Sequence, residues 1–347
     1  MRKSKMKAAI LHGIGDLRVE EVEVPEIGFG EVLAEVKAAT TCGTDVKILR
    51  RGYVGEIVSY PMPFGHEWSG VVKEVGPDVE AFKPGDRIRA GNSAPCYSCS
   101  MCAEGKYNLC MNRTWLWGAY AEGIKVPSQI VLHNAQTFPD SLSFEEAAVA
   151  EPLACVLHGS DKVGTAPGDS VAIIGAGPIG LLHLLVAKQK GAGWVFISDL
   201  VDERLEAAER LGADETINSE REDLTSIVKE LTYGLGVDVA IESVGTPQTW
   251  MDALSLVKNG GRVLEFGGAP SGTTIEVETE LLHYGELTIM GSFHAAPSDF
   301  ERALQMIVDR QIDVKPLITR RMRLDDIAEA FEILSTSKGE LKIAIIP

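Results

Sequence analysis

The chain has 347 residues, of which 45% are hydrophobic and 24% charged, and its formal net charge is −17. This length favours two domains over a single core, and the composition is that of an ordinary globular protein. The negative charge argues against a nucleic-acid or anionic-membrane partner, because either needs a basic face. Residues 1–7 are basic but are followed by no uninterrupted apolar segment, so we expect a cytoplasmic protein without a signal peptide or transmembrane helix.

The first part of the chain predicts a domain made of many short strands. We expect strands at 7–11, 17–24, 31–38, 68–75 and 86–90, separated by turns that contain Gly and Pro. A short helix should begin near Asp45, and residues 61–67 should be extended because their prolines disfavour a helix. Such a pattern is typical of a barrel-like β domain, which we place at residues 1–152.

After Glu151 the pattern changes to strands that alternate with helices. We expect strands at 171–175, 194–199, 214–217, 237–242, 261–266 and 286–291. These elements predict a doubly wound parallel sheet, and hence a Rossmann dinucleotide-binding domain at residues 153–291. Helices near 298–310 and 324–335 and a strand at 341–346 follow. Because six strands complete the sheet, we expect residues 292–347 to return to the first domain.

A glycine-rich turn follows the first of these strands. The turn reads Gly175-Ala176-Gly177-Pro178-Ile179-Gly180, and an apolar helix pattern begins directly after it. The three glycines suit a sharp turn, a close approach of pyrophosphate to the backbone, and tight packing of helix on strand. The N-terminus of the helix also favours phosphate.

An acidic residue stands at the end of the second strand of this domain. Asp199 follows the turn by about 20 residues, the distance at which a carboxylate accepts hydrogen bonds from an adenosine ribose. This arrangement predicts a preference for NAD, because the carboxylate would repel the 2′-phosphate of NADP. Arg204 lies nearby in the sequence and would soften that repulsion.

Four of the six cysteines form one cluster with the spacing Cys96-x2-Cys99-x2-Cys102-x7-Cys110. In a cytosolic protein such clustering indicates a metal more often than disulfides. Four thiolates suit tetrahedral zinc and leave no open coordination position, so the predicted role is structural. The alternative is an iron–sulfur cluster, which also takes four cysteines.

A second metal site is a weaker prediction from spacing alone. Cys42, His66, Glu67 and Glu151 are separated in sequence, but a thiolate, an imidazole and a carboxylate together make a plausible zinc site. The residue pattern leaves open which of the two carboxylates would bind the metal directly.

Taken together, these motifs resemble the zinc-dependent medium-chain alcohol dehydrogenases, and within them the sorbitol, threonine and butanediol dehydrogenase branch. The resemblance covers nearly the whole chain and keeps the order and spacing of the family's motifs. It rests on the following segments: 42–45, 65–67 with Gly70, the four-cysteine cluster, 151–153, the glycine turn, Asp199, 242–245 and 291–292.

The resemblance implies a GroES-like β domain that holds a catalytic zinc and a Rossmann domain that binds NAD. Cys42 and His66 would bind that zinc, with Glu67 and Glu151 as candidates for the carboxylate, and the four-cysteine cluster would hold the second zinc of the chain. Thr44 would begin a proton relay toward the cofactor. Family members often have His at the position of Lys47, so this chain departs from the family at the far end of the relay.

The predicted activity is hydride transfer between NAD and a secondary alcohol or the corresponding ketone, the alcohol being a polyol, a diol or a hydroxy amino acid. Two alternatives remain: a sugar-phosphate or sugar-alcohol-phosphate dehydrogenase of the same fold, and a nucleotide-binding relative without catalysis. Family resemblance also implies a homo-oligomer, either a dimer or a tetramer.

Overall fold

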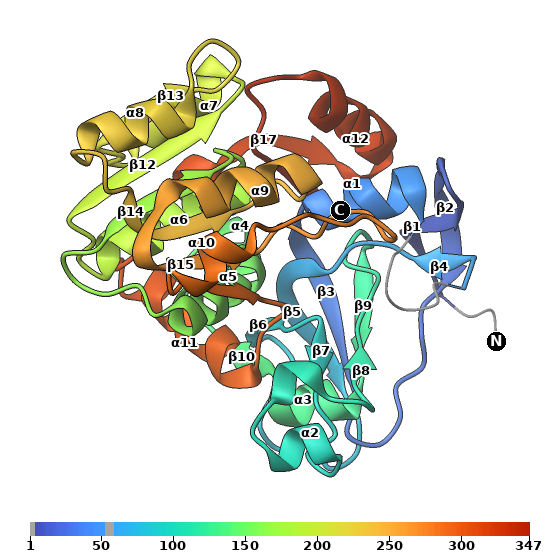
Figure 1. The fold of residues 1–347 in the computed structure, drawn as a ribbon. Helices are drawn as coiled ribbons and strands as arrows, with labels where there is room; N and C mark the ends of the chain where they lie inside the picture. Colours follow the sequence, from blue (N-terminus) through green and yellow to red (C-terminus); the bar gives the residue numbers. More distant parts are fainter. Residues whose placement is uncertain (1–3, 53–58) are drawn as a thin grey trace. The chain divides into compact units, whose positions relative to one another are not determined.

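The computed structural model describes residues 4–52 and 59–347, so the first three residues of the basic N-terminus lie outside it. The chain divides into two units (Figure 1). One comprises Met1–Ala154 with Ala295–Pro347, and the other comprises Cys155–His294.

The first unit is built mainly from antiparallel strands. Its strands are β1 (Lys5–Gly13), β2 (Asp16–Glu23), β3 (Val32–Thr40), β4 (Met62–Pro63), β5 (Glu67–Val75), β6 (Arg87–Ala90), β7 (Ser93–Ala94), β8 (Thr114–Trp115), β9 (Gly123–Val126), β10 (Ala135–Thr137), β17 (Ile318–Arg323) and β18 (Lys342–Ile346). Its helices are α1 (Gly43–Arg51), α2 (Ser100–Ala103), α3 (Ser128–His133), α4 (Phe144–Ala148), α11 (Pro297–Val308) and α12 (Ile327–Thr336), with short 3₁₀ turns at Tyr107–Leu109, Lys315–Leu317 and Leu324–Asp326.

The largest sheet of this unit has the order β10-β6-β5-β3-β18-β17, and β9 pairs with β3. The alternating pattern of 31–38 predicts a half-buried strand, but the residues of β3 are almost all buried, because β3 lies in the interior of this sheet and pairs with several strands. β18, near the C-terminus, pairs antiparallel with β3, with Ala344 opposite Thr40. The C-terminal strand therefore lies beside the segment that leads into α1.

The second unit is a six-stranded, wholly parallel sheet with helices. Its elements are β11 (Ser170–Ile174), α6 (Pro178–Gln189), β12 (Trp194–Asp199), α7 (Asp202–Arg210), β13 (Glu215–Asn218), α8 (Leu224–Leu231), β14 (Val237–Glu242), α9 (Pro247–Leu256), β15 (Val257–Glu265), α10 (Thr279–His283) and β16 (Thr288–Gly291). Helix α5 (Ala150–Val163) begins in the first unit and ends in the second.

The order of this sheet is β13-β12-β11-β14-β15-β16. The chain winds outward from β11 to β13 on one side and from β14 to β16 on the other. This reversal beside β11 is the switch point at which doubly wound sheets bind ligands. The predicted α/β fold, with a GroES-like domain and a Rossmann sheet, is confirmed.

Helix α5 and strand β17 are among the elements that were not predicted, and each has a physical reason. Helix α5 contains Pro152 and Gly159, but Pro152 lies in its first turn, where the missing N–H removes no helical hydrogen bond. Strand β17 is an edge strand parallel to β18. Most of its residues are exposed, and three of them are Arg, so it lacks the apolar alternation of a half-buried strand.

The glycine turn has the close contacts that its residue pattern predicts. Gly175 has a φ of +98°, and a Cβ there would lie 2.8 Å from Val244 Cγ2. A Cβ at Gly180 would lie 1.7 Å from the carbonyl oxygen of Gly175, so only glycine lets α6 begin this close to β11. Around Gly177 a Cβ would meet nothing within 4 Å, which leaves open space beside the backbone.

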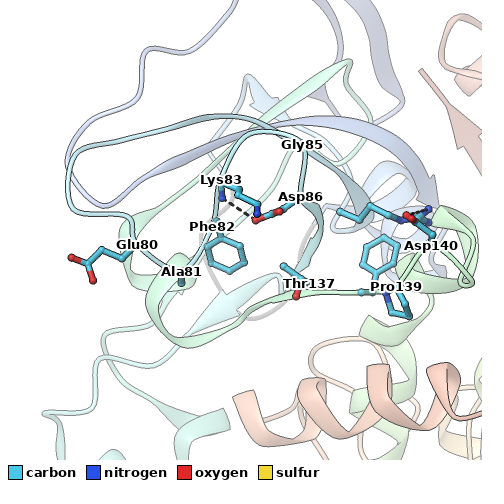
Figure 2. Close-up of a pocket in the computed structure, with 11 residues that line it drawn as sticks. Glu80, Ala81, Phe82, Lys83, Gly85, Asp86, Thr137, Pro139 and Asp140 are labelled. Carbon is cyan, nitrogen blue, oxygen red and sulfur yellow. Dashed lines mark hydrogen bonds and ion pairs between the residues drawn. The ribbon is translucent and has the colours of Figure 1, made fainter.

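The first unit also contains an open cavity of about 580 Å³ (Figure 2). Phe82 and Phe138 contribute to its lining, and the guanidinium of Arg87 lies 4.8 Å from the centre of the Phe138 ring. Predicted ligands of zinc or of the cofactor are absent from its lining. Among the residues that the structure describes, no helix is both long enough and apolar enough to cross a bilayer.

Candidate functional site

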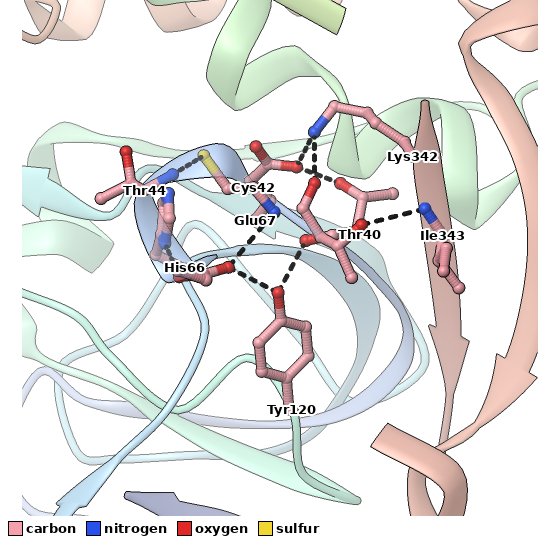
Figure 3. A network of polar contacts seen from close by, with 10 residues as sticks. Thr40, Cys42, Thr44, His66, Glu67, Tyr120, Lys342 and Ile343 are labelled. Atoms are coloured by element: carbon pink, nitrogen blue, oxygen red, sulfur yellow. Dashed lines mark hydrogen bonds and ion pairs between the residues drawn. The ribbon is translucent and has the colours of Figure 1, made fainter. Parts of the chain in front are cut away.

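Three residues with metal-binding side chains meet where β3, α1 and β5 come together (Figure 3). Cys42 caps the N-terminus of α1, His66 directly precedes β5, and Glu67 is the first residue of β5. One ligand atom from each lies within 4.8 Å of the others. The pairing of Thr40 with Glu67 across β3 and β5 explains why residues so far apart in sequence meet here.

A carboxylate holds the ring of His66. Nδ1 of His66 lies 2.9 Å from Oδ1 of Asp45, and the hydroxyl of Tyr120 donates to Asp45 Oδ2 at 2.6 Å. Because a carboxylate only accepts, Nδ1 carries the proton and Nε2 is left as the ligand atom. Burial alone would lower the pKa of His66, but Asp45 and Cys42 outweigh burial and raise that pKa well above its usual value.

The glycine before His66 is required by close packing. Gly65 has a φ of +88°, and a Cβ there would lie 2.5 Å from the ring of Tyr120. Tyr120 is fully buried and its ring also packs on Phe64 and Phe331. The Gly-His-Glu sequence therefore brings the backbone against an aromatic ring whose hydroxyl supports Asp45.

The two oxygens of Glu67 differ in their surroundings. Oε2 accepts a hydrogen bond from Lys342 Nζ at 2.6 Å and another from the hydroxyl of Thr40. Oε1 is buried and has no hydrogen-bond partner. An unpartnered buried carboxylate oxygen beside a thiol and an imidazole fits a zinc ion, which such ligands bind.

Glu151 lies in the first turn of α5 and is 4% exposed. Burial raises the pKa of its carboxyl group to about 7. His66 opposes that shift, and Glu67 adds to it. Glu151 therefore interacts electrostatically with this centre, whereas Cys42, His66 and Glu67 form the group whose ligand atoms lie within 4.8 Å.

The four-cysteine cluster forms a separate group in the first unit. Sulfur–sulfur distances are 3.5 Å for Cys99–Cys102 and for Cys96–Cys110, and 3.9 Å for Cys99–Cys110. Four sulfurs bound tetrahedrally at 2.3 Å from one ion would be about 3.8 Å apart, so the thiols fit a zinc ion. Backbone amides already donate to two of them, from Cys96 N to Cys110 Sγ and from Met111 N to Cys99 Sγ.

The pKa values of these thiols are shifted in opposite directions. The hydroxyl of Ser98 lowers the pKa of Cys96 to about 5, whereas burial raises the pKa of Cys102 to about 12. Thiols packed this closely cannot all ionise unless a cation joins them, and metal binding supplies that cation.

In the second unit, Asp199 is tied to the glycine turn. Its Oδ2 accepts from Ala176 N at 2.8 Å, and its Oδ1 accepts from Leu200 N at 2.8 Å and from Val201 N at 3.1 Å. Arg204 Nη1 lies 3.7 Å from Asp199 Oδ2. The predicted ribose acceptor and the predicted phosphate turn are therefore held together at the ends of β11 and β12.

Aromatic side chains near the group formed by Cys42, His66 and Glu67 differ in which residue they contact. Trp117 lies edge-on to His66, with ring centres 5.4 Å apart, and Trp115 lies beside Trp117. Tyr120 is fully buried, and its hydroxyl donates to Asp45.

The sequence analysis missed three contacts around Cys42, His66 and Glu67: those that Thr40 and Lys342 make with Glu67, and that of Asp45 with His66. Lys342 had one signal, since it is a charged residue at the start of the apolar C-terminal strand. Its partner, 275 residues away, could not be predicted from that signal.

Comparisons with known proteins agree with this arrangement. Residues 28–136 match the family model of the alcohol dehydrogenase GroES-like domain, and residues 178–309 match that of the zinc-binding dehydrogenases. Sorbitol dehydrogenase of Bacillus subtilis is 35% identical over 99% of this chain and 97% of its own length.

Two solved structures share the fold over nearly their full length. A zinc-binding dehydrogenase from Sinorhizobium meliloti, bound to NADP, is 34% identical with a TM-score of 0.91, covering 99% of this chain and 100% of that one. The 2R,3R-butanediol dehydrogenase of Bacillus subtilis is 30% identical with a TM-score of 0.89, covering 99% of each chain. The chain is therefore an enzyme and belongs to the zinc-dependent medium-chain alcohol dehydrogenase family.

Proposed function

We propose that this enzyme oxidises a secondary alcohol with NAD, and that the alcohol is a polyol, a diol or a hydroxy amino acid. The observation that carries the proposal is the group of Cys42, His66 and Glu67, in which the buried Oε1 of Glu67 lacks a partner. Supporting it, the relatives named sorbitol and butanediol dehydrogenase align over almost the whole chain.

Two zinc ions per chain are part of the proposal. Cys42, His66 and Glu67 would hold the catalytic ion, Glu151 would act through water, and Cys96, Cys99, Cys102 and Cys110 would hold the structural ion. When bound, the catalytic ion supplies Lewis-acid chemistry that lowers the pKa of a coordinated hydroxyl.

The chain's own residues would prepare this chemistry. Asp45 keeps the proton of His66 on Nδ1 and so presents Nε2. The hydroxyl of Thr44 follows Cys42 at the start of α1, and it can accept the proton of the substrate alcohol and pass it on, because a hydroxyl both accepts and donates. Lys47 is exposed on the same helix and has no place in this relay.

For the cofactor, we propose that the turn formed by Gly175, Gly177, Pro178, Ile179 and Gly180 binds the pyrophosphate and that Asp199 binds the adenosine ribose. The open space at Gly177 and the N-terminus of α6 support the first assignment. We also propose a catalytic domain of residues 1–152 and 292–347, a cofactor domain of residues 153–291, and a homo-oligomer, which light scattering would measure.

A substrate panel tests the activity. Polyols, diols, threonine and sugar phosphates would be offered with NAD, and NADH formation would be followed by absorbance. The proposal expects turnover of at least one secondary alcohol without phosphate, and loss of that turnover in Cys42→Ser with the fold retained. Turnover of sugar phosphates alone would contradict the proposed substrate class, and wild-type turnover in Cys42→Ser would contradict the proposed metal centre.

A further inference from the structure

The pair formed by Glu67 and Lys342 is fully enclosed in the first unit. The side chain of Lys342 is 2% exposed and that of Glu67 is 0% exposed, and their charged atoms are 2.6 Å apart (Figure 3). Removing two charges from water costs about as much as their attraction returns, so such a pair rarely exists for stability alone. Its place directly beside the candidate zinc ligands suggests a role in the site.

The position of Lys342 is fixed by the strand that carries it. Ile343 N donates to the hydroxyl of Thr41 at 2.9 Å, and Thr41 N donates to Ile343 O at 3.1 Å. The ammonium group of Lys342 also donates to Thr41 O at 2.8 Å. Because a shift of one residue would turn the side chain to the opposite face, this register determines that the ammonium group meets Glu67.

The two donors on Glu67 act on one oxygen only. Lys342 and Thr40 both donate to Oε2, and the positive charge of Lys342 repels a metal cation from that atom. Oε1 remains unpartnered and buried beside the other candidate ligands. The carboxylate is thereby oriented before a metal arrives, with one oxygen available.

We propose that Lys342, together with Thr40, is a positioning residue that makes Glu67 a one-oxygen ligand of the catalytic zinc. This inference rests on the proposed function, since it assumes that Cys42, His66 and Glu67 bind that ion. It assigns a role in the centre to the C-terminal strand of the chain.

The test measures how fast zinc leaves the purified holoenzyme in the presence of a chromogenic chelator. Cys42→Ser and Cys99→Ser assign the release phases to the catalytic and structural ions. Lys342→Met removes the ammonium group but keeps the length of the side chain, and Thr40→Val removes only the hydroxyl donor. Arg320→Met is the matched control. Arg320 lies on the neighbouring strand β17, and the substitution removes the cation of its ion pair with Glu340.

Loss of a residue that orients a metal ligand typically costs about 10–100-fold in affinity. We therefore expect Lys342→Met to accelerate release of the catalytic zinc by about 10–100-fold and Thr40→Val to accelerate it less, with release of the structural zinc unchanged in both. In Glu67→Ala, the added substitution Lys342→Met should cause no further acceleration, because no carboxylate is left to orient. A purely structural lysine would not depend on Glu67 in this way.

Three results would overturn the inference. Unchanged release from folded Lys342→Met would do so while leaving the zinc centre intact. If Lys342→Met does not fold, Thr40→Val is the fallback variant, because it keeps the buried ion pair that the fold needs. Unchanged release from Thr40→Val would then overturn the proposal that the two donors position Glu67 together. A wild-type enzyme with no zinc that depends on Cys42 would instead refute the proposed function, and the inference with it.

Discussion

Glu242 and Glu265 are paired across the parallel strands β14 and β15, and both side chains are buried. Neither oxygen of Glu265 has a hydrogen-bond partner, whereas Oε1 of Glu242 accepts from Val244 N, Gly245 N and the hydroxyl of Thr249. Burial raises the pKa of Glu265 to about 8, and the nearby Glu242 adds to the shift. Glu265 is thus a carboxylic acid that folding favours in its neutral form.

This shift predicts how stability depends on pH. The pKa of Glu265 is higher in the folded state than the usual value of 4.5, so its contribution to stability falls as the pH rises from about 5 to about 8. Glu265→Gln, which cannot ionise, should unfold at a higher temperature than the wild type, and the difference should grow through this pH range. Thermal melts from pH 5 to 8 measure it, with the exposed Glu230→Gln as the control. A difference that does not change with pH would contradict the assignment.

The metal content of the purified enzyme provides a second prediction. The wild-type enzyme should contain two zinc ions per chain and should show no absorption band in the visible range. Cys99→Ser should lose the structural ion and unfold at least about 5 °C lower, because the ion contributes free energy of folding and each kcal/mol corresponds to roughly 2–4 °C. Metal analysis with thermal melts measures both effects. Iron with acid-labile sulfide in the wild type would show that the structural-zinc prediction is wrong.

Much of this architecture could be predicted from the sequence because local residue patterns determine it. The glycine turn, the apolar strands around it and the four-cysteine cluster each need only neighbouring residues, and the structure shows why Gly175 and Gly180 are required. Family resemblance then supplied Cys42, His66 and the two glutamates.

The remaining features depend on contacts between distant segments. Lys342 meets Glu67 only because β18 pairs with β3, and no local pattern specifies that pairing. Helix α5 is an exception with a local cause: Pro152 argues against a helix, but in the first turn it removes no helical hydrogen bond. The buried position of Glu265 follows from the order of strands in the sheet.

Cofactor choice gives a third prediction, centred on Asp199. Wild type should use NAD with a higher kcat/KM than NADP, although the relative from Sinorhizobium meliloti was crystallised with NADP. Asp199→Asn removes the charge but keeps an acceptor for Ala176 N, and it should lower kcat/KM with NAD by about 10–100-fold, the value of a hydrogen bond to a charged group.

Arg204→Ala should sharpen the preference for NAD, since Arg204 lies 3.7 Å from the carboxylate and would offset its charge toward a 2′-phosphate. Arg210 lies on the exposed side of the same helix, so Arg210→Ala is the control. It should leave the ratio of kcat/KM with NAD to kcat/KM with NADP unchanged. Equal or better efficiency of the wild type with NADP would show that the argument from Asp199 is wrong.

The proton path out of the site gives the last prediction, which separates Thr44 from Lys47. Thr44 follows the candidate ligand Cys42, and its backbone N–H donates to Cys42 Sγ at 3.4 Å, so changing its side chain leaves that contact in place. Thr44→Val removes the hydroxyl and should lower kcat by at least about 100-fold, the usual contribution of a positioned proton-transfer group. Thr44→Ser keeps a hydroxyl and should retain most of the activity. Lys47→Ala should also retain it, because the exposed ammonium group has no lone pair with which to accept a proton. Steady-state kcat for the three variants decides the matter: if Lys47→Ala fell to the level of Thr44→Val, the lysine would belong to the relay.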